Sequence, residues 1–392
     1  MATNDNPMMD RIRRAALGIG IACLALCGAG ALVRPDIVSR GYLVAYCYVA
    51  GLALGSMAIV MVHHLTGGRW GVLARRVLES AASTMPALAL LFLPILLGRD
   101  SLYPWTNESA VAADPVLRQK SLYLNVSAFS VRAAVYFAIW VFIASLLSRW
   151  SRQDDETGEP RVRARLRALS GPGLVLYGLT ITFAAIDWVM SLEPRWFSTI
   201  FAVVFGVAQM LSAMAFAILT LSLLASRRAL DGLASARTCR DLGNLLLTLV
   251  MFWTYTAFSQ FLLIWAGNLP DEIAWYLPRF DGGWKWIALS VILLQFALPF
   301  VFLLFRRVKE DLSYLARVAV LILATCFVNM LWQIVPAFPP GGLVAHWLDV
   351  VAAIIALLGV GGVWLALFLG QLKRMPLVPL QAAASAEVAA HG

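Results

Sequence analysis

Long apolar runs separated by short polar stretches dominate the pattern of this chain. A helix that crosses a bilayer needs about 20 consecutive apolar residues, and ten runs reach that length. The predicted spans lie near residues 15–33, 41–63, 78–98, 124–148, 171–190, 197–225, 241–264, 286–305, 313–335 and 344–370. We therefore predict an all-α, polytopic membrane protein of about ten transmembrane helices.

Composition supports this prediction. The chain has 61% hydrophobic and 14% charged residues, whereas a soluble domain has about 45–50% apolar and about 25% charged residues. No polar stretch between the spans is long enough to fold as a separate soluble domain. We predict a single integral membrane domain over residues 1–375 and a disordered, alanine-rich tail over residues 376–392.

The positive charges are distributed unevenly between the two sets of loops. Of the 31 lysines and arginines, 21 lie in the loops that share a side with both termini, 8 lie in the opposite loops and 2 lie within spans. Positively charged loops remain in the cytoplasm, so we predict that both termini are cytoplasmic. The net charge of +9 therefore reflects membrane topology, and nucleic acid is not an expected partner. The basic N-terminus before the first run resembles a signal peptide, but we predict an uncleaved first span because its cleavage-site match is loose.

The stretch from residue 183 to 201, FAAIDWVMSLEPRWFSTIF, combines apolar runs with charged residues. Asp187 lies near the end of one run, and Glu193 lies in the break that follows. A carboxylate at membrane depth costs about 2.5–3.5 kcal/mol on insertion scales, so it is a functional candidate. Pro194 ends the helix that precedes it. We predict a tight helical hairpin presenting two carboxylates, one guanidinium and two indoles at one membrane face: Asp187, Glu193, Arg195, Trp188 and Trp196.

Polar residues of other spans fall at a similar depth. With a helical rise of about 1.5 Å per residue, the following residues are predicted near the external ends of their spans: Arg132, Gln260, Asn329, Gln333, His346 and Asp349. This convergence predicts a polar site beneath the external lipid headgroups. The inner half is sparser, with Glu79 and Arg317 near cytoplasmic ends and no acid at mid-depth.

Each candidate also has a structural interpretation. Asp187 either pairs with an arginine or loop amides, or takes part in proton or quinone chemistry. Glu193 either shapes the loop or has a function. Arg132 is expected in an internal ion pair, because an unpaired charge there is costly. His346 and Asp349, three residues apart, form either a local pair or part of a site.

The remaining polar residues have a stronger structural interpretation. Gln260, Asn329 and Gln333 are expected to form interhelical hydrogen bonds. Glu79 and Arg317 either snorkel to the interface, which is the commoner role of such residues, or are candidates for a proton pathway.

The sequence shows no pattern of ligands for a redox cofactor. A membrane b-type haem usually takes two histidines from facing helices at similar depth, and none of the possible pairs among His63, His64, His346 and His391 fits. The five cysteines show no paired spacing for iron–sulfur or zinc ligation. We expect no covalently bound or metal-ligated cofactor, and any electron transfer would belong to partner proteins.

Several segments resemble a known family. They are DWVMSLEPRWFSTIF from Asp187, LYPW from Leu102, VRAAVYFAIW from Val131, TYTAFSQFLLIWAGNLPDEIAWYLPR from Thr254 and GGWKWIALSVILLQFALPF from Gly282. They resemble the membrane subunits of alternative complex III, the bacterial quinol:cytochrome c oxidoreductase, and more narrowly its smaller, ActF-type subunit of the NrfD-like (polysulfide-reductase-type) family. The likeness spans most of residues 100–310, whereas the first hundred residues and those past 340 share only hydrophobicity.

The resemblance implies NrfD-like helix bundles in a bacterial inner membrane and a respiratory role. It implies quinone binding or proton conduction, with menaquinone or ubiquinone as a possible substrate. It also implies partners: a sister NrfD-like subunit, periplasmic multihaem cytochrome and iron–sulfur subunits, and membrane lipid. The long external loops at 99–123 and 265–285, rich in tryptophan and tyrosine, are either an interfacial aromatic belt or a docking surface for the periplasmic subunits.

A quinol site needs an apolar slot, hydrogen-bonding groups and a proton acceptor. Near the external face, the candidates for such a site are Asp187, His346, Asp349, Trp188 and Trp196. Two other functions remain open. A secondary transporter would show inverted repeats and midplane carboxylates, and neither is visible here. A passive anchor for periplasmic subunits would need none of the buried acids.

Overall fold

The structure is a computed structural model that describes residues 7–225, 235–339 and 342–374. All regular elements within these ranges are helices. In chain order they are α1 (Pro7–Val33), α2 (Pro35–Thr66), α3 (Arg69–Ala82), α4 (Met85–Leu91), α5 (Leu93–Leu97), α6 (Arg99–Leu102), η1 (Pro104–Thr106), α7 (Glu108–Ala113), α8 (Pro115–Lys120), α9 (Val126–Thr157), α10 (Pro160–Trp188), η2 (Met190–Leu192), α11 (Phe201–Ala225), α12 (Ala236–Gly267), α13 (Pro270–Ile273), α14 (Leu277–Phe280), α15 (Trp284–Val291), η3 (a π-helix, Ile292–Ala297), α16 (Leu298–Leu304), α17 (Arg306–Glu310), α18 (Leu312–Ile334), η4 (Val335–Ala337) and α19 (Trp347–Lys373).

Ten segments in the described part of the chain are long and apolar enough to cross a membrane. Each overlaps one of the ten predicted runs, so the prediction of an all-α polytopic membrane protein is confirmed. Six are single long helices, and a seventh (Leu312–Ala337) is the long helix α18 followed by the short 3-10 turn η4. The third (Leu73–Leu97), fifth (Pro160–Leu192) and eighth (Trp284–Leu304) are each composed of more than one helical element. The proposed tail at 376–392 lies outside the described residues.

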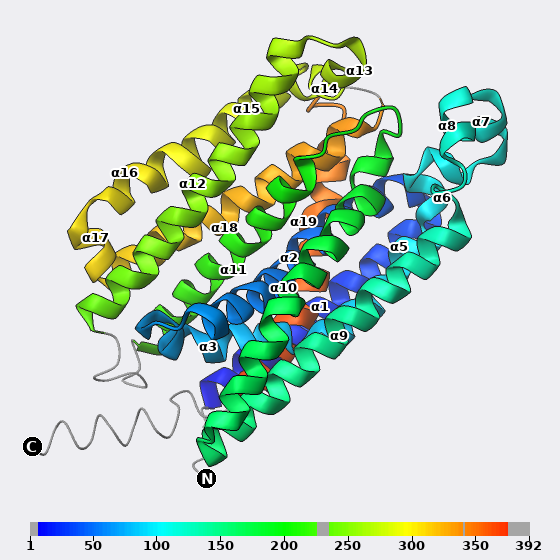
Figure 1. Cartoon of the computed structure of the whole chain (residues 1–392). Coiled ribbons are helices and arrows are strands. Elements are labelled where there is room, and N and C mark those ends of the chain that lie inside the picture. Colours follow the sequence, from blue (N-terminus) through cyan, green and yellow to red (C-terminus); the bar gives the residue numbers. More distant parts are fainter. Residues whose placement is uncertain (1–6, 226–234, 340–341, 375–392) are drawn as a thin grey trace, which may run out of the picture.

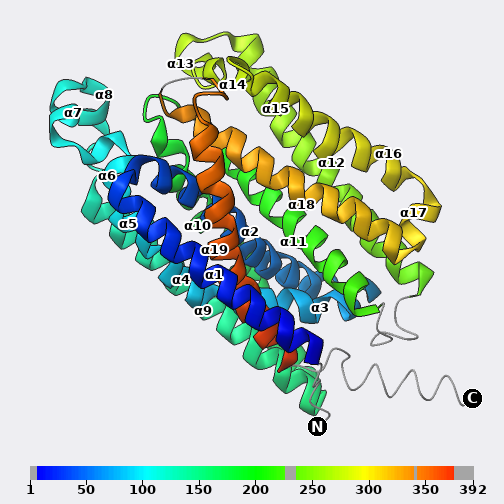
Figure 2. The same ribbon diagram turned by 180° about the vertical axis from the view of Figure 1, so that it is seen from behind.

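Helix α2 forms the centre of the bundle. It packs against α11, α19, α10, α3 and α18 (Figure 1). Nearly all residues of its most apolar stretch are buried. Helices α19 and α1 both pack against one side of α2, and α1 lies along α19 (Figure 2). The α9–α10 hairpin covers a second side, and α12, α15, α16 and α18 form the third. Most apolar residues of α1 are exposed on the outside of the bundle, so this helix presents its outer face to lipid.

Both described chain ends lie at one face of the bundle. Lys373 near the end of α19 forms an ion pair with Asp10 near the start of α1, with Nζ 2.7 Å from both carboxylate oxygens. We call this end, which also carries residues 149–167, the arginine-rich end. The opposite end carries the short helices α6–α8, α13 and α14 (Figure 1), and we call it the loop end.

Two long helices meet at the arginine-rich end. α9 runs on to Thr157 and α10 begins at Pro160. The turn between them is Gly158, with φ +63°, and Glu159. Glycine adopts this left-handed conformation without the penalty that a Cβ brings, so two long helices join through a two-residue turn.

Candidate functional site

Three separate ion clusters lie at the loop end, each built from residues of different helices. The first joins α9 to α10. Arg132 holds both carboxylate oxygens of Asp187, with Nε–Oδ2 and Nη2–Oδ1 distances of 2.9 Å. The hydroxyl of Tyr136 donates to Asp187 Oδ2 at 2.8 Å. The Arg132 guanidinium also lies over the ring of Tyr123, 3.8 Å from its centroid. The expected internal ion pair of Arg132 is confirmed, and its partner is Asp187.

This geometry arises from the α9–α10 hairpin. Its two-residue turn keeps the helices antiparallel and adjacent, so Arg132 near the start of α9 lies opposite Asp187 near the end of α10. A bidentate guanidinium–carboxylate pair is strong and directional. The side chain of Asp187 is nearly fully buried and accepts three hydrogen bonds, two from Arg132 and one from Tyr136.

The second cluster joins the break after α10 to α14. Arg279 Nη2 contacts Glu193 Oε2 at 2.6 Å and the carbonyl of Gln333 at 2.7 Å. Its Nη1 donates to the carbonyl of Trp275 at 2.6 Å, and the guanidinium lies 3.7 Å from the centroid of that ring. Burial lowers the pKa of Arg279, and the charge of Glu193 opposes this effect. Glu193 therefore ties the hairpin to α14 and to the end of α18.

The third cluster lies where α19 begins. His346 Nδ1 is 2.6 Å from Asp349 Oδ2, and Arg40 Nη1 of α2 is 3.7 Å from Asp349 Oδ1. Both His346 and Asp349 are buried. Asp349 belongs to the first turn of α19, where the helix dipole stabilises a negative charge. His346 precedes the helix rather than lying within it as expected.

The structure does not bring these clusters into one site. Among the described residues, no hydrogen bond or ion pair links Asp187 with His346 or Asp349, and none of the three lines either described cavity. The expectation that they surround the hairpin together is therefore wrong. The physical reason is pairing: Arg132 turns Asp187 towards α9, and Arg40 and His346 hold Asp349 at the base of α19.

The two tryptophans of the hairpin also separate. Trp188 is buried against Phe92, Phe137 and Trp140 in the α9–α10 core. Trp196 instead stacks on Trp275, with centroids 4.8 Å apart and an interplanar angle of 17°. The hairpin therefore does not present paired indoles at one face, because its two halves pack into different helix groups.

A cavity of about 600 Å³ lies on the Trp196 side of the hairpin, among α11, α12, α15, η3 and α18. Its walls are mainly aromatic and aliphatic, and the few polar side chains include Gln260, Asn329 and Gln333. Tyr255 and Phe258 line it and are exposed on the outer surface of α12. The cavity therefore opens towards lipid, and its size falls within the usual range for small-molecule sites.

The polar atoms of this cavity are concentrated towards the loop end. Gln260 accepts from Ser198 at 3.2 Å and donates to the hydroxyl of Tyr276 at 3.4 Å. Burial raises the pKa of Tyr276 to about 12, so this phenol stays protonated at neutral pH. The side-chain oxygen of Gln333 and the indole nitrogen of Trp253 are buried with no partner among the described residues. Such unsatisfied atoms are costly, and a ligand with hydroxyl or carbonyl groups would satisfy them.

The cavity and the second cluster share a wall. Trp275 and Gln333 line the cavity, and their carbonyls accept hydrogen bonds from Arg279. The sequence pattern singled out neither Arg279 nor Arg40. The available signal for Arg279 was its position in the aromatic run WYLPRF, which favours cation–π contact. Interhelical hydrogen bonds were expected for Gln260 and Gln333. Gln260 instead bonds to Ser198 and Tyr276, which lie in loops, and the side-chain oxygen of Gln333 has no partner among the described residues.

At the arginine-rich end, Glu79 and Arg317 differ. Glu79 is buried, 2.9 Å from Arg76 Nη1, in an ion cluster that includes Arg75 and Asp155. Its expected snorkelling is therefore wrong, because α9 supplies acids that keep this cluster inside the bundle. Arg317 is exposed, with its guanidinium 4.5 Å from the ring centroid of Tyr314, as expected for a snorkelling side chain. Among the described residues, no group of three or more histidines, cysteines or acids is placed to hold a metal ion.

These features define a class of protein: a multi-pass α-helical membrane protein with a lipid-facing apolar cavity beside buried ion pairs. No family model matches the sequence, and no curated protein matches it. Function must therefore be argued from the site.

Proposed function

We propose that this chain is a membrane subunit of a respiratory quinol:cytochrome c oxidoreductase of the alternative complex III type. In this proposal it contributes quinone or quinol binding, together with proton conduction near the external face. It holds no redox centre of its own. The sequence resemblance suggests the complex, and the cavity beside the Glu193–Arg279 pair is the observation that carries the binding role.

The cavity suits a quinone in shape and polarity. A quinone combines an apolar ring and tail with two oxygens at opposite ends of the ring. Aromatic walls such as Phe261 and Trp332 would contact the ring, and the opening at Phe258 would admit the tail from the bilayer. Gln260 and Gln333 supply hydrogen-bonding groups at the closed end, and neither adds a net charge to the apolar slot.

Proton release would use the neighbouring ion pairs. Glu193 contacts the cavity wall through Arg279, and its own side chain is partly exposed at the loop end. This provides a carboxylate between the cavity and the aqueous face. The His346–Asp349 pair is a second candidate, because Nε2 of His346 is buried without a partner among the described residues and could accept a proton. Asp187, held by Arg132, serves the proton path only if that pair opens.

The proposal includes location and partners. The chain would lie in the bacterial inner membrane with the arginine-rich end in the cytoplasm. The loop end would face the periplasm, where α6–α8, α13 and α14 would meet multihaem cytochrome and iron–sulfur subunits. The sister NrfD-like subunit would lie beside it in the membrane. Menaquinone or ubiquinone would be the substrate.

Photoaffinity labelling of the intact complex with an azido-quinone tests the binding role. We expect crosslinks on α12, η3 or α18, at residues lining the cavity, and competition by unlabelled quinol. Gln333→Leu is expected to weaken labelling and to raise the quinol KM about tenfold, since a hydrogen bond worth about 1.4 kcal/mol would be lost.

Gln295→Leu is the matched control. Gln295 is a fully buried glutamine of the adjacent π-helix, but it does not line the cavity. It should leave labelling and KM unchanged. Labelling confined to another subunit, with normal turnover of Gln333→Leu, would leave this chain as a passive anchor for the periplasmic subunits.

A further inference from the structure

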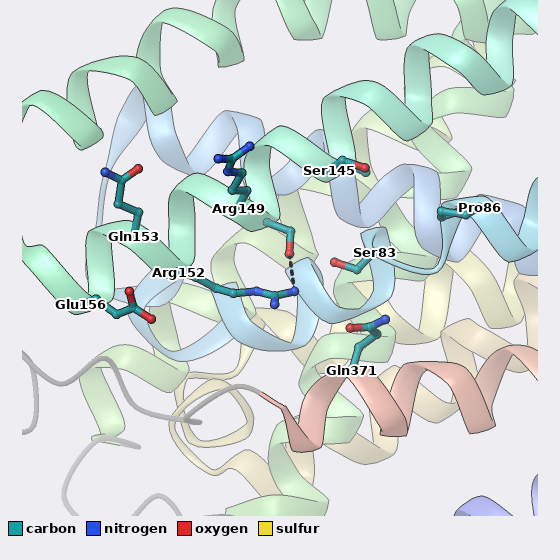
Figure 3. Close-up of a pocket in the computed structure, with 10 residues that line it drawn as sticks. Ser83, Pro86, Ser145, Arg149, Arg152, Gln153, Glu156 and Gln371 are labelled. Carbon is teal, nitrogen blue, oxygen red and sulfur yellow. Dashed lines mark hydrogen bonds between the residues drawn. The ribbon is translucent and has the colours of Figure 1, made fainter. Parts of the chain in front are cut away.

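A second cavity, of about 620 Å³, lies near the arginine-rich end and has a different character. Three elements line it: the α3–α4 junction with Ser83, the last turns of α9, and the end of α19 with Gln371. Arg149, Arg152 and Glu156 contribute two positive charges and one negative charge. Arg152 donates a hydrogen bond to the hydroxyl of Ser148, one turn earlier in α9, and Figure 3 shows Gln371 of α19 pointing towards Arg152.

The lining of α9 follows one helical stripe. Ser145, Ser148, Arg149, Arg152 and Glu156 are spaced by three or four residues, which places them on one face of the helix. The same face continues towards the loop end as an exposed apolar strip. Its members are Val131, Val135 and Phe142, which are 63%, 48% and 62% exposed. The stripe therefore changes from lipid-facing hydrocarbon to charged groups within one helix.

The charged groups that line this cavity have no oppositely charged partner within the described residues. On its other side, α9 directs Asp154 and Asp155 towards Arg75 and Arg76 of α3. By contrast, no described residue pairs with the guanidinium of Arg149 or the carboxylate of Glu156, and Arg152 contacts only the neutral Ser148 within the described part of the chain. Arg149, Arg152 and Glu156 are exposed at the arginine-rich end of α9. Two arginines at the end of a membrane span, without a counter-ion in the described chain, favour an anionic ligand at the level of the lipid headgroups.

We infer that this cavity binds the headgroup of a phospholipid, with phosphatidylethanolamine favoured. The phosphodiester would contact Arg149 and Arg152, and the hydroxyls of Ser83 and Ser145 could donate to it. The ammonium group would pair with Glu156, whose negative charge disfavours a purely anionic headgroup. The acyl chains would lie along Val135 and Phe142. This lipid would fill the gap between α4, α9 and α19 on a side of the bundle away from the quinone cavity.

Native mass spectrometry of the detergent-purified protein, after delipidation and titration with defined lipids, tests this inference. We expect one phosphatidylethanolamine to bind, with phosphatidylglycerol and phosphatidylcholine weaker. The double variant Arg149→Gln/Arg152→Gln should weaken binding by about tenfold or more. Arg165→Gln/Arg167→Gln, two exposed arginines of α10 outside the cavity, is the matched control and should bind as the unmodified protein does.

Two further measurements distinguish the source and orientation of the ligand. Glu156→Gln should retain lipid but lose the preference for ethanolamine over glycerol headgroups. Free phosphoethanolamine should compete poorly, because it lacks the acyl chains that contact the apolar strip. Equal lipid binding by the arginine double variant and the control would overturn the inference. If free phosphoethanolamine bound as tightly as phosphatidylethanolamine, the inference would also fail, and the ligand would be a soluble phosphate ester.

Discussion

At the scale of single residues, the charges near the loop end are stabilised by specific partners. Asp187 has Arg132 and Tyr136, Glu193 has Arg279, and Asp349 has His346 and Arg40. An isolated charge in a low-dielectric interior is costly, whereas a pair with well-placed hydrogen bonds is tolerated. The pairs of Asp187 with Arg132, Glu193 with Arg279 and Asp349 with Arg40 join elements distant in sequence, so they determine how these elements dock.

Replacing Asp187 with asparagine should destabilise the protein. Arg132 would retain its charge, with its side chain only 19% exposed, but would lose its counter-ion. We expect a loss of about 3 kcal/mol, measured as a lower thermal unfolding midpoint in detergent. The double variant Asp187→Asn/Arg132→Gln should recover part of this loss because the uncompensated charge is gone. A double variant as unstable as the sum of its single variants would contradict the pairing.

The same variant tests the catalytic role expected from sequence. If Asp187 takes part in proton transfer, then in the assembled complex Asp187→Asn lowers quinol:cytochrome c turnover with a changed pH profile. If the residue is structural, Asp187→Glu and Asp187→Asn change turnover only in proportion to the amount of folded subunit. Activity per folded complex across pH separates these outcomes. Wild-type activity in Asp187→Asn at every pH would exclude the proton role.

At the scale of elements, close helix packing places α2 at the centre. Gly55 of α2 faces the backbone of α11: a Cβ there would lie 2.2 Å from the carbonyl oxygen of Gln209. Small residues allow membrane helices to approach closely, and this contact replaces a hydrophobic driving force that lipid does not supply. The position therefore determines the distance between two of the most buried helices.

Gly55→Ala should separate α2 from α11. We expect a destabilisation of about 1–3 kcal/mol from overpacking, measured by thermal unfolding in detergent. Gly18→Ala on α1 is the control, since a Cβ there meets nothing within 4 Å and alanine favours the helix. Equal stability of the two variants would show that the α2–α11 contact adapts without cost.

Docking of α7 and α8 at the loop end should depend on pH. Arg195 donates to Asp114 at 2.9 Å, and this hydrogen bond lowers the pKa of Asp114 below its ordinary value of 3.8. A lowered carboxyl pKa contributes stability above the ordinary value, which is lost as pH falls through the folded value. We expect hydrogen-exchange protection of residues 108–120 to decrease as pH falls below 3.8.

Asp114→Asn is the control for this pH effect. It cannot titrate, so the protection of α7 and α8 should already be reduced at neutral pH and should show no step near the carboxyl pKa. A step of equal size in both proteins would assign the pH effect to another group.

At the scale of the whole molecule, ten spans place both described ends at the arginine-rich face, tied by Asp10 and Lys373. The opposite face carries the short helices and the aromatic loops. The distribution of positive charge predicts which face is cytoplasmic. The quinone and lipid proposals depend on the two cavities, which lie in different helix groups and at different ends.

Cysteine labelling tests this orientation. In a background lacking the five native cysteines, we expect Ser109→Cys at the loop end to react with a membrane-impermeant maleimide on spheroplasts. Glu159→Cys at the arginine-rich end should react only after the membrane is opened. Both positions are exposed, so access is decided by the membrane side. The reverse pattern would invert the topology and place the apolar cavity beside Gln333 near the cytoplasm.

Much of the architecture followed from the sequence. Membrane insertion demands long apolar segments whose backbone hydrogen bonds are internal, so hydropathy alone located all ten helices. The break within 183–201 was also recognisable from Pro194 and the charges. It is not the tight hairpin expected, because α10 already ends at Trp188, the turn η2 follows, and α11 begins only at Phe201. The pairing of Arg132 followed from the cost of a lone charge, although several acids could have been its partner.

Tertiary structure decided the rest. Depth along a helix can be counted from sequence, but the direction in which a side chain points around the bundle depends on which helices are neighbours. For that reason Asp187, His346 and Asp349 share an end of the bundle without sharing a site. For the same reason Gln260 and Gln333 meet in a cavity that no local pattern indicates. Apolar periodicity specifies that a helix crosses the membrane, while packing between helices distant in sequence determines where space remains for a ligand.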